Sequence, residues 1–409
     1  MSSSSIEMPR LTALIGFAEA LAAPEVAWSL IDGGFDVIAF ARKGYHSPLR
    51  HSRHVTVKDI CPPEVDLQVA QSDLQSLMAS LRATDDRKIL FPLDDTSVWL
   101  CSILQLERPW VLAGPHGQSA HLALDKHLQT EMALEAGFSV PHTFLVRTET
   151  ELLDYCDNTS FPVILKPANC VPVSRNRVSK CRNWICANRD EVQRARNEWR
   201  ERVPLLVQPF IAGIGEGIFG LVAPDGIRAW SAHRRLRMMN PQGSGSSACI
   251  SQPVPQELTP AVEKLLQKGL WRGLFMIELL RDRSGKLWFV ELNGRPWGSM
   301  ALSRRQGFEY PAWHLRLALD QQSRVGTASP AADGVVCRNI GREIMHLLFV
   351  LRGPKSKALR DWPSFWKTLR EVARVRRGDA LYNWRREDPK VFIADCCYTI
   401  RSNVFKTSH

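Results

Sequence analysis

Apolar and polar residues alternate with two different periods along the first 115 residues. Short apolar runs predict buried strands at residues 11–17, 35–41, 89–92 and 110–112. Between these runs, apolar residues recur with helical spacing at residues 24–32 and 66–82, which predicts two helices. Strands that alternate with helices favour a parallel sheet, so we expect an N-terminal α/β domain at residues 11–118. No Gly-x-Gly-x-x-Gly follows the first strand, which gives no support to a dinucleotide site of that type.

The next 200 residues also combine strands with helices. A helix that opens at 124–126 stops at Gly137, and Val140-Pro141 prevents its continuation. Two runs that flank Pro224-Asp225-Gly226 predict a hairpin, and therefore antiparallel pairing. Further strands are expected at residues 144–147, 161–167 and 205–211, and further helices at 187–200, 260–269 and 310–319.

Two glutamates, Glu278 and Glu291, lie in apolar runs on either side of the polar turn 282–285. This pattern predicts a β-hairpin, and counting outward from the middle of the turn places the two glutamates opposite each other. Like charges in that position destabilise a sheet, so a compensating charge is needed, and a divalent cation is the usual one. Asn293 shares the same face and adds an oxygen ligand of the kind that Mg²⁺ prefers. The other face is expected to join the core through Phe275, Ile277, Leu279, Trp288, Val290 and Leu292.

The composition is that of an ordinary globular protein of two or three domains, with 409 residues of which 44% are hydrophobic. No apolar run is long enough to span a bilayer. Residues 1–10 are polar, carry no apolar signal segment and are expected to form a disordered tail. We therefore expect a cytoplasmic protein whose ten cysteines are reduced thiols.

Positive charge is concentrated near the C-terminal end. From residue 352 onwards there are 14 Lys and Arg but only 6 Asp and Glu, which accounts for +8 of the net charge of +11. Residues 321–333, rich in small polar residues, predict a linker to a basic, mostly helical unit at 334–409. Apolar residues at 362–373 recur with helical spacing, which favours packing on the unit itself and leaves peripheral membrane contact open. No nucleic-acid partner is expected, because no zinc-finger, helix-turn-helix or aromatic–basic RNA motif accompanies these charges.

Several short motifs follow one another between residues 11 and 320. They are Asp125-Lys126, Pro162-Val163-Ile164-Leu165-Lys166-Pro167, Val207-Gln208-Pro209-Phe210-Ile211, Ile277-Glu278 and Val290-Glu291-Leu292-Asn293-Gly294-Arg295. Each is weak alone, but their order resembles the ATP-grasp superfamily, which includes carboxylate–amine ligases, D-alanine–D-alanine ligase, glutathione synthetase and biotin carboxylase. The resemblance implies an α/β (α+β) fold: a Rossmann-like parallel-sheet domain at 11–118 and a two-lobed ATP-grasp domain with antiparallel sheets at 119–320. The helical unit that follows matches no feature of the family.

The resemblance also implies a site for ATP and Mg²⁺. Lys126 and Lys166 match the lysines that reach the nucleotide phosphates, although either lysine alone is typical of a protein surface. Glu216 is a candidate for binding the ribose hydroxyls and equally for a solvated loop acid. The backbone hinge that hydrogen-bonds adenine is matched by Gln208, Pro209, Phe210 and Ile211. The magnesium ligands are matched by Glu278, Glu291 and Asn293.

Two arginines are expected to serve catalysis. Arg295 matches a family position near the transferred phosphate, where a guanidinium offsets developing negative charge. Arg237 ends a basic run that precedes the Gly/Ser loop 243–247, and similar stretches in the family face an acid substrate. The family's phosphate cover is usually glycine-rich, whereas the matching stretch 168–180 contains no glycine. Whether this stretch closes over the phosphates therefore stays open.

These residues together predict an ADP-forming ligase. A substrate carboxylate would attack the γ-phosphorus to give an acyl phosphate, and an amine would then displace phosphate. Two alternatives stay open: a small-molecule kinase that stops at phosphoryl transfer, and a nucleotide-responsive binding protein without turnover. The expected partners are small-molecule carboxylate and amine substrates, and the family often forms homodimers.

Overall fold

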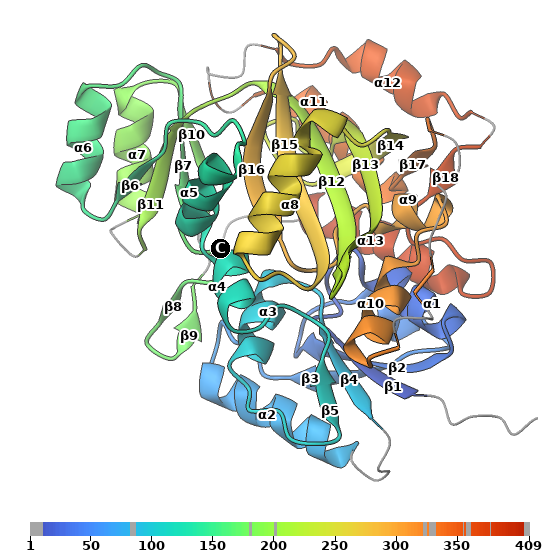
Figure 1. Ribbon diagram of the computed structural model, residues 1–409. Helices are drawn as coiled ribbons and strands as arrows, with labels where there is room; N and C mark the ends of the chain where they lie inside the picture. The colour runs from blue at the N-terminus through green and yellow to red at the C-terminus, as the bar shows by residue number, and fades with distance from the viewer. Residues whose placement is uncertain are drawn as a thin grey trace, which may run out of the picture.

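The structure, a computed structural model, describes residues 11–81, 87–179, 182–199, 203–321, 325–326, 333–354, 356, 361–376 and 378–404. The predicted tail and most of the predicted linker lie outside these residues. Three sheets and a two-stranded hairpin make up the described strands. In Figure 1 the N-terminal sheet lies at the bottom, a small sheet at the left and a large sheet at the upper centre.

The N-terminal residues form a parallel sheet, as predicted, but it has five strands, one of which, Thr56–Ile60, was not among the four expected. Its order is β3-β2-β1-β4-β5, so the winding reverses direction between β1 and β4. Ala13 and Ile15 join a core on one face, and Leu14 and Phe40 join a core on the other, as expected of a parallel sheet covered on both sides. The strands are β1 (Leu11–Gly16), β2 (Phe35–Arg42), β3 (Thr56–Ile60), β4 (Lys88–Pro92) and β5 (Trp110–Leu112). The helices are α1 (Ala23–Asp32), η1 (Pro48–His51), α2 (Leu67–Ser80), α3 (Asp95–Ser102) and α4 (Gln118–Leu124).

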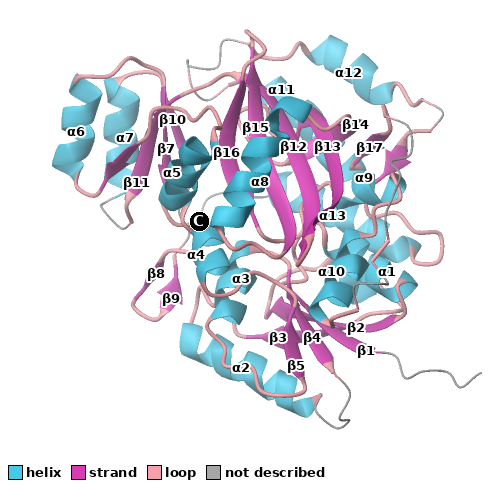
Figure 2. Ribbon diagram, in the orientation of Figure 1, coloured by secondary structure: helices cyan, strands magenta, loops and turns pink. Residues whose placement is uncertain are grey.

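The small sheet is antiparallel, in the order β10-β7-β11-β6. Its strands are β6 (Phe144–Val146), β7 (Val163–Pro167), β10 (Trp184–Cys186) and β11 (Leu205–Pro209). Helices α6 (Glu149–Asp157) and α7 (Arg189–Trp199) lie on one face (Figure 2). Val163 and Leu165 point into the core beneath these helices, so Lys166 lies on the opposite face.

The large sheet has seven strands in the order β16-β15-β12-β13-β14-β17-β18. One face packs on α5 (Lys126–Ala136) and α8 (Thr259–Lys268), which follows the short η2 (Gln256–Leu258). The other face packs on α9 (Met300–Arg305), α10 (Tyr310–Ala318) and the N-terminal domain. The strands are β12 (Gly213–Ala223), β13 (Gly226–Met238), β14 (Ser246–Gln252), β15 (Gly273–Asp282), β16 (Leu287–Asn293), β17 (Val336–Arg338) and β18 (Ala380–Leu381).

The C-terminal residues are built into this sheet and do not form a separate body. β17 pairs with β14, and β18 pairs with β17, so both strands extend the large sheet. Three helices accompany them, α11 (Ile340–Arg352), α12 (Phe365–Ala373) and α13 (Pro389–Val404). Asp388 accepts hydrogen bonds from Trp28 and Ser52 of the N-terminal domain, and α13 packs against η1. The predicted unit at 334–409 therefore connects two domains, which its local composition gave no means of predicting.

The glutamate hairpin forms, but with a different turn from the one predicted. The N–H of Asp282 donates to the carbonyl of Lys286 at 3.0 Å, and Gly285 takes a φ of +88°. A three-residue turn that ends in the left-handed region favours glycine at that position. Arg281 consequently pairs with Leu287, one residue away from the predicted register.

A bulge at Val290 restores the predicted register further along the hairpin. Glu278 therefore does face Glu291, as the sequence predicted. The same bulge changes which side chains reach the core, because the strand alternation shifts by one residue between the turn and Glu291. Leu287 and Phe289 pack on the core, in place of the predicted Trp288 and Val290.

The glycine-free stretch 168–180 forms a small hairpin of β8 (Val173–Ser174) and β9 (Arg177–Val178) in its described part. Its turn residues Arg175 and Asn176 take left-handed φ values of 48° and 59°. Asn176 docks this hairpin on the N-terminal domain: its carbonyl accepts the N–H of Leu67 at 2.8 Å, and its side chain donates to Asp66 at 2.9 Å. The hairpin thus supplies a partner for a first-turn N–H group of α2.

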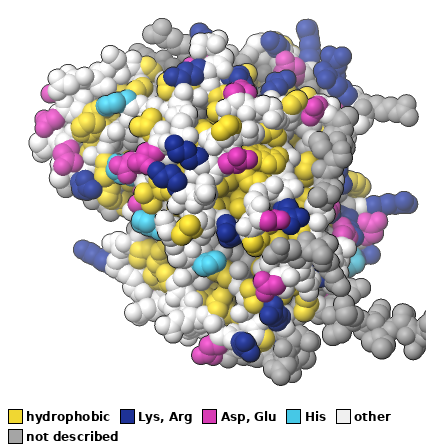
Figure 3. Space-filling model, viewed as in Figure 1, with side chains coloured by type: hydrophobic (Ala, Val, Ile, Leu, Met, Phe, Trp, Pro, Cys, Tyr) yellow, Lys and Arg dark blue, Asp and Glu magenta, His cyan; other side chains and the backbone are white. Residues whose placement is uncertain are grey.

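No described helix combines the length and the apolar character needed to cross a bilayer. The predicted apolar stripe is only partly covered: Nε1 of Trp362 donates to the carbonyl of Val350 at 2.9 Å, whereas Trp366 is 70% exposed. Lys367 and Arg370 are exposed on the same helix. Figure 3 shows Lys and Arg side chains gathered at the upper right, where α12 lies in Figure 1.

Candidate functional site

Glu278 and Glu291 lie opposite each other on β15 and β16, and each has its own cation. Nη2 of Arg235 lies 2.7 Å from Oε1 of Glu278, and Nζ of Lys126 lies 2.9 Å from Oε2 of Glu291. Arg235 reaches Glu278 across Gly215, where an added Cβ would lie 2.7 Å from Cδ of the arginine. The repulsion between the two carboxylates is therefore offset by one lysine and one arginine.

Lys126 and Lys166 come from separate elements and meet beside this pair. The backbone N–H of Lys126, the first residue of α5, donates to the carbonyl of Ala168 at 2.8 Å. Ala168 directly follows β7, which carries Lys166. The carboxylate of Asp125 caps α5 by accepting two backbone N–H groups, which fixes where the helix begins. The Asp125-Lys126 motif thus places a lysine at the junction between the small sheet and the large sheet.

The two ammonium groups experience opposite surroundings. The charge of Glu291 raises the pKa of Lys126. Burial, and then the neighbouring charge of Lys126, lower the pKa of Lys166 from 10.5 to about 8. Lys166 is only 7% exposed, and none of the described carboxylates lies within ion-pair distance of it. Lys166 is therefore a buried cation whose charge is not balanced by an acid of its own.

The amide of Asn293 supports Glu291. Its Nδ2 donates to Oε1 of Glu291 at 3.0 Å. Burial opposes ionisation of Glu291, but the charge of Lys126 and this hydrogen bond outweigh it, so the pKa of Glu291 lies far below its usual range. A carboxylate that stays ionised at neutral pH is suited to binding a cation.

Gln129, which the sequence did not point to, fixes the strand between Glu291 and Asn293. Its Nε2 donates to the carbonyl of Leu292 at 2.9 Å, and its Oε1 accepts the N–H of Leu292 at 2.9 Å. Gln129 is buried on α5, and its partner lies 163 residues further along the chain. A glutamine on a helix gives no local sign of such a long-range contact.

Arg295 connects the carboxylate pair to the N-terminal domain. Its Nε and Nη2 donate to the two oxygens of Asp95 at 2.7 and 3.2 Å. Asp95 begins α3 directly after β4, next to the point where the parallel sheet reverses its winding. Burial lowers the pKa of Arg295, but Asp95 outweighs this effect and raises it. Arg295 in turn helps to keep the pKa of Glu291 low.

Arg237, the second predicted catalytic arginine, is held in a different network. Its Nε and Nη2 donate to the carboxylate of Glu343 at 2.9 and 2.7 Å. Glu343 belongs to α11 and also accepts hydrogen bonds from Arg338 at 3.0 Å and Ser247 at 2.7 Å. The structure therefore does not bring Arg237 to the carboxylate pair as a free cation, because a buried acid from the C-terminal part neutralises it.

Glu216 also lies away from this group. Glu216 pairs with Leu279 across β12 and β15, whereas its neighbour Gly217 pairs with Glu278, so the two glutamates point to opposite faces of the sheet. Glu216 is buried and accepts hydrogen bonds from Arg281 at 2.6 and 3.0 Å. The described geometry therefore does not bring Glu216 to the lysines or to the carboxylate pair.

The predicted adenine hinge lies at the end of β11. Nε2 of Gln208 donates to Oγ1 of Thr143 at 2.6 Å, and the N–H of Phe210 donates to the carbonyl of Pro162 at 2.9 Å. Pro209 is exposed and Ile211 is half-buried. The contact with adenine remains a prediction for these residues.

The structure thus gathers the predicted residues Lys126, Lys166, Glu278, Glu291, Asn293 and Arg295 into one group. In the described part of the chain, no three His, Cys, Asp or Glu side chains form a metal-binding cluster. The group offers two carboxylates and an amide, a hard oxygen set that suits Mg²⁺ when phosphates complete the coordination. The lysines and Arg295 of this group can bind a polyanion, and its carboxylates can bind a divalent cation.

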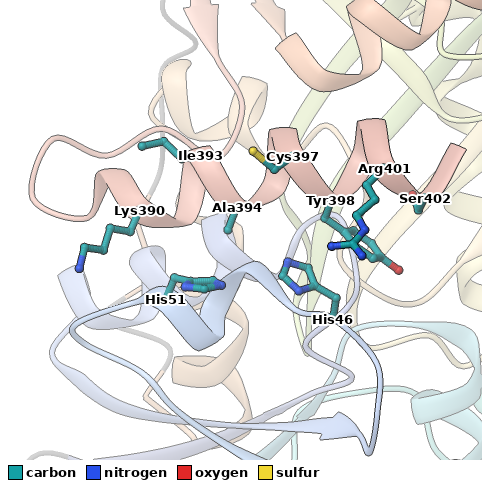
Figure 4. Close-up of a pocket in the computed structure, with 9 residues that line it drawn as sticks. All are labelled: His46, His51, Lys390, Ile393, Ala394, Cys397, Tyr398, Arg401 and Ser402. Atoms are coloured by element: carbon teal, nitrogen blue, oxygen red, sulfur yellow. The ribbon is translucent and has the colours of Figure 1, made fainter. Parts of the chain in front are cut away.

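A separate cavity of about 870 Å³ lies between η1 and α13 (Figure 4). His46 and His51 line it from the N-terminal domain, and Lys390 and Arg401 line it from α13. It contains none of the residues gathered around Glu278 and Glu291.

The sequence matches no protein-family model and no curated protein. Solved structures share the fold at low identity. The biotin carboxylase domain of 2-oxoglutarate carboxylase from Hydrogenobacter thermophilus, crystallised with MgADP, ADP and bicarbonate, has a TM-score of 0.60 at 16% identity, covering 80% of this chain and 73% of that one. An L-amino acid ligase from Bacillus licheniformis has a TM-score of 0.56 at 15% identity, covering 78% of each chain. An N5-carboxyaminoimidazole ribonucleotide synthetase, solved with ADP, has a TM-score of 0.59 at 13% identity, covering 89% and 96%.

Proposed function

Because the chain has the ATP-grasp fold, we propose that it is an ADP-forming ligase that activates a carboxylate with ATP and joins it to an amine. The observation that carries this proposal is Lys166, a buried ammonium with no acid of its own beside a second ammonium. A buried ammonium next to the half-buried ammonium of Lys126 favours a polyanion that offsets both charges, and a nucleotide polyphosphate supplies one. The structures with ADP among the similar proteins support this choice.

The residues fit Mg²⁺ and ATP in a specific way. Glu278, Glu291 and Asn293 would hold Mg²⁺, which when bound offsets phosphate charge and orients the phosphates for transfer. Lys126 is paired with Glu291 at 2.9 Å and would exchange this partner for a phosphate oxygen. The ion pairs of Lys126 and Arg235 hold the two carboxylates in position before the nucleotide arrives.

In the reaction, these side chains position groups and offset charge. A carboxylate oxygen of the acid attacks the γ-phosphorus, the bond to the β-phosphate oxygen breaks, and ADP leaves. Lys166 and Arg295 offset the negative charge that spreads over the transferred phosphate. The amine then attacks the acyl carbon, phosphate leaves, and the nitrogen loses a proton. No enzyme nucleophile is required for either step.

The proposed test uses hydroxylamine as a trapping nucleophile. Purified protein is incubated with ATP, Mg²⁺, hydroxylamine and a metabolite extract, and ADP and hydroxamates are measured by mass spectrometry. We expect both products from the wild-type protein and from Glu263→Ala, a control on the exposed face of α8. Glu291→Ala should form neither.

The other outcomes separate the alternatives. Phosphate esters without hydroxamates would indicate a kinase, because hydroxylamine captures acyl phosphates and leaves esters intact. Tight binding of Mg-ATP without turnover would indicate a nucleotide-responsive binding protein. Absence of both Mg-ATP binding and ADP formation would refute the proposal.

We further propose that the ligase is a cytoplasmic homodimer that acts on small molecules. The biotin carboxylase domain with this fold was crystallised as a dimer, which supports the homodimer. Light scattering at micromolar concentration would measure the mass directly, and a monomer would exclude this part of the proposal.

A further inference from the structure

Arg342, an arginine of the C-terminal part, lies near Arg235 and has no acid partner of its own among the described residues. Arg342 is in the first turn of α11, next to Glu343, and its Nη1 donates to the carbonyl of Ser246 at 3.2 Å. Gly245 leaves room for it, since an added Cβ would lie 2.6 Å from Nη1. No carboxylate in the described ranges lies within ion-pair distance of Arg342.

Four other arginines of this region are paired with acids. Arg235 bonds Glu278, Arg237 and Arg338 share Glu343, and Arg295 bonds Asp95. Arg342 therefore differs from these four arginines, although it is half-buried in the same region. A guanidinium has five N–H donors, and a single carbonyl uses one of them.

Asp395 is the acid whose charge acts most strongly on Arg342, and it is hydrogen-bonded to other residues. Oδ2 of Asp395 accepts hydrogen bonds from the side-chain amides of Asn339 at 3.0 Å and Asn383 at 3.1 Å. Burial raises the pKa of Asp395. Burial also lowers the pKa of Arg342, and the charge of Asp395 offsets only part of this lowering. The guanidinium of Arg342 thus stands in a place where an additional anion would be stabilising.

Arg235 connects the carboxylate pair with Arg342. The charge of Arg235 acts on Arg342, and both charges act on the thiol of Cys249. Cys249 pairs with Arg235 across β13 and β14, so the two arginines approach the same strand position. Arg235 itself contacts Glu278 at 2.7 Å. A molecule that is held at one end by Arg342 would therefore reach past Arg235 toward the proposed magnesium position.

We propose that Arg342 binds a second carboxylate of the acid substrate, so that the enzyme selects dicarboxylic acids. This inference rests on the proposed ligase function. The carboxylate that attacks phosphorus must lie beside Glu278 and Glu291. Arg342 lies beyond Arg235, further from these two glutamates. The group at Arg342 is consequently not the group that is phosphorylated. Arg342 replaces Arg237 as the arginine that recognises the acid, because Glu343 already occupies Arg237.

The test compares diacids with their monoamides: L-glutamate with L-glutamine, L-aspartate with L-asparagine, and succinate with succinamate. ADP and hydroxamate formation are measured at varied acid concentration with saturating Mg-ATP. We expect the wild-type protein to use at least one diacid with a KM about 10-fold or more below that of its monoamide. Arg342→Gln should raise the KM for the diacid about 10- to 100-fold, with the KM for ATP and for the monoamide unchanged.

Two further variants and one binding measurement complete the design. Arg342→Lys should recover part of the diacid affinity, because it restores the charge but not the fork of donors. Arg352→Gln, at the exposed far end of α11, should behave as wild type. Calorimetric titration of the preferred diacid without nucleotide should show the same loss for Arg342→Gln, and circular dichroism should show that this variant is folded.

The outcomes separate this inference from the function on which it rests. Failure to bind Mg-ATP would refute the proposed ligase itself. A protein that binds Mg-ATP and forms hydroxamates, but whose folded Arg342→Gln variant keeps its diacid preference, would refute only the role of Arg342. Equal use of diacids and monoamides by the wild-type protein, or use of no diacid while Mg-ATP binds, would overturn it as well.

Discussion

Replacing Lys166 by methionine should make the protein more stable while abolishing nucleotide binding. Methionine has a similar unbranched shape, fills the same space and carries no charge. Lys166 is 7% exposed and its ammonium lies beside that of Lys126. The positive charge of Lys166, which would bind a polyphosphate, therefore destabilises the folded protein when no nucleotide is bound.

The size of the effect follows from the pKa of Lys166. Its lowering from 10.5 to about 8 corresponds to roughly 3 kcal/mol of unfavourable free energy for the charged form in the folded state. Below pH 8 the lysine is protonated in both folded and unfolded states, so the whole cost is present. Between pH 8 and 10.5 the unfolded chain keeps the proton and the folded protein has lost it, so the wild-type protein gains stability as pH rises. At pH 7, Lys166→Met should therefore be more stable than wild type by about 2–3 kcal/mol.

The assay is urea unfolding at pH 7.0 and pH 9.5, followed by tryptophan fluorescence. Comparing variant with wild type at each pH cancels the titration of groups that both proteins share. Lys126→Met is the matched variant with the opposite sign: it leaves Glu291 without its partner at 2.9 Å and should destabilise the protein by about 2 kcal/mol. Calorimetry should detect Mg-ATP binding for neither variant.

Two results would refute the reasoning. One is a Lys166→Met variant that is less stable than wild type at pH 7. The other is a stability gap between this variant and wild type that stays constant from pH 7.0 to pH 9.5, since titration of Lys166 must narrow it.

Three further predictions address the neighbouring elements. Glu291→Ala should lower ADP formation by at least about 100-fold with an unchanged circular dichroism spectrum, because several kcal/mol of metal-dependent charge stabilisation are lost, and near wild-type turnover would remove Glu291 from the site. Asn176→Gly keeps the left-handed turn but removes the side-chain contacts with α2, so hydrogen exchange in the 173–178 hairpin should accelerate about 10-fold; unchanged exchange would show that the side chain does not hold the hairpin. Gly215→Ala should destabilise the protein by about 1–3 kcal/mol in thermal unfolding, and an Arg235→Ala background should remove most of this loss, because the clash is with that side chain.

Much of the fold could be predicted because its signals are local. The parallel N-terminal sheet follows from strands that alternate with helices, and the end of α5 follows from Gly137, which takes a φ of +108°. The facing of Glu278 and Glu291 could also be predicted, although the turn differs by one residue and a bulge compensates for the shift. The pairing of side chains along a hairpin depends on a short count from the turn, which the sequence contains.

By itself, the sequence determined the type and order of the elements, the cluster of acids and lysines, and the hard-oxygen character of the site. Only the tertiary structure decided which cation serves which acid. Arg237 is neutralised by Glu343, which lies 106 residues later, while Arg342 on the same helix keeps its charge unpaired by an acid among the described residues. Glu216 turns to the opposite face through the pairing of β12 with β15. The physical reason is that an ion pair depends on distances across separate elements, whereas the patterns of a sequence report only the period and the polarity of each element.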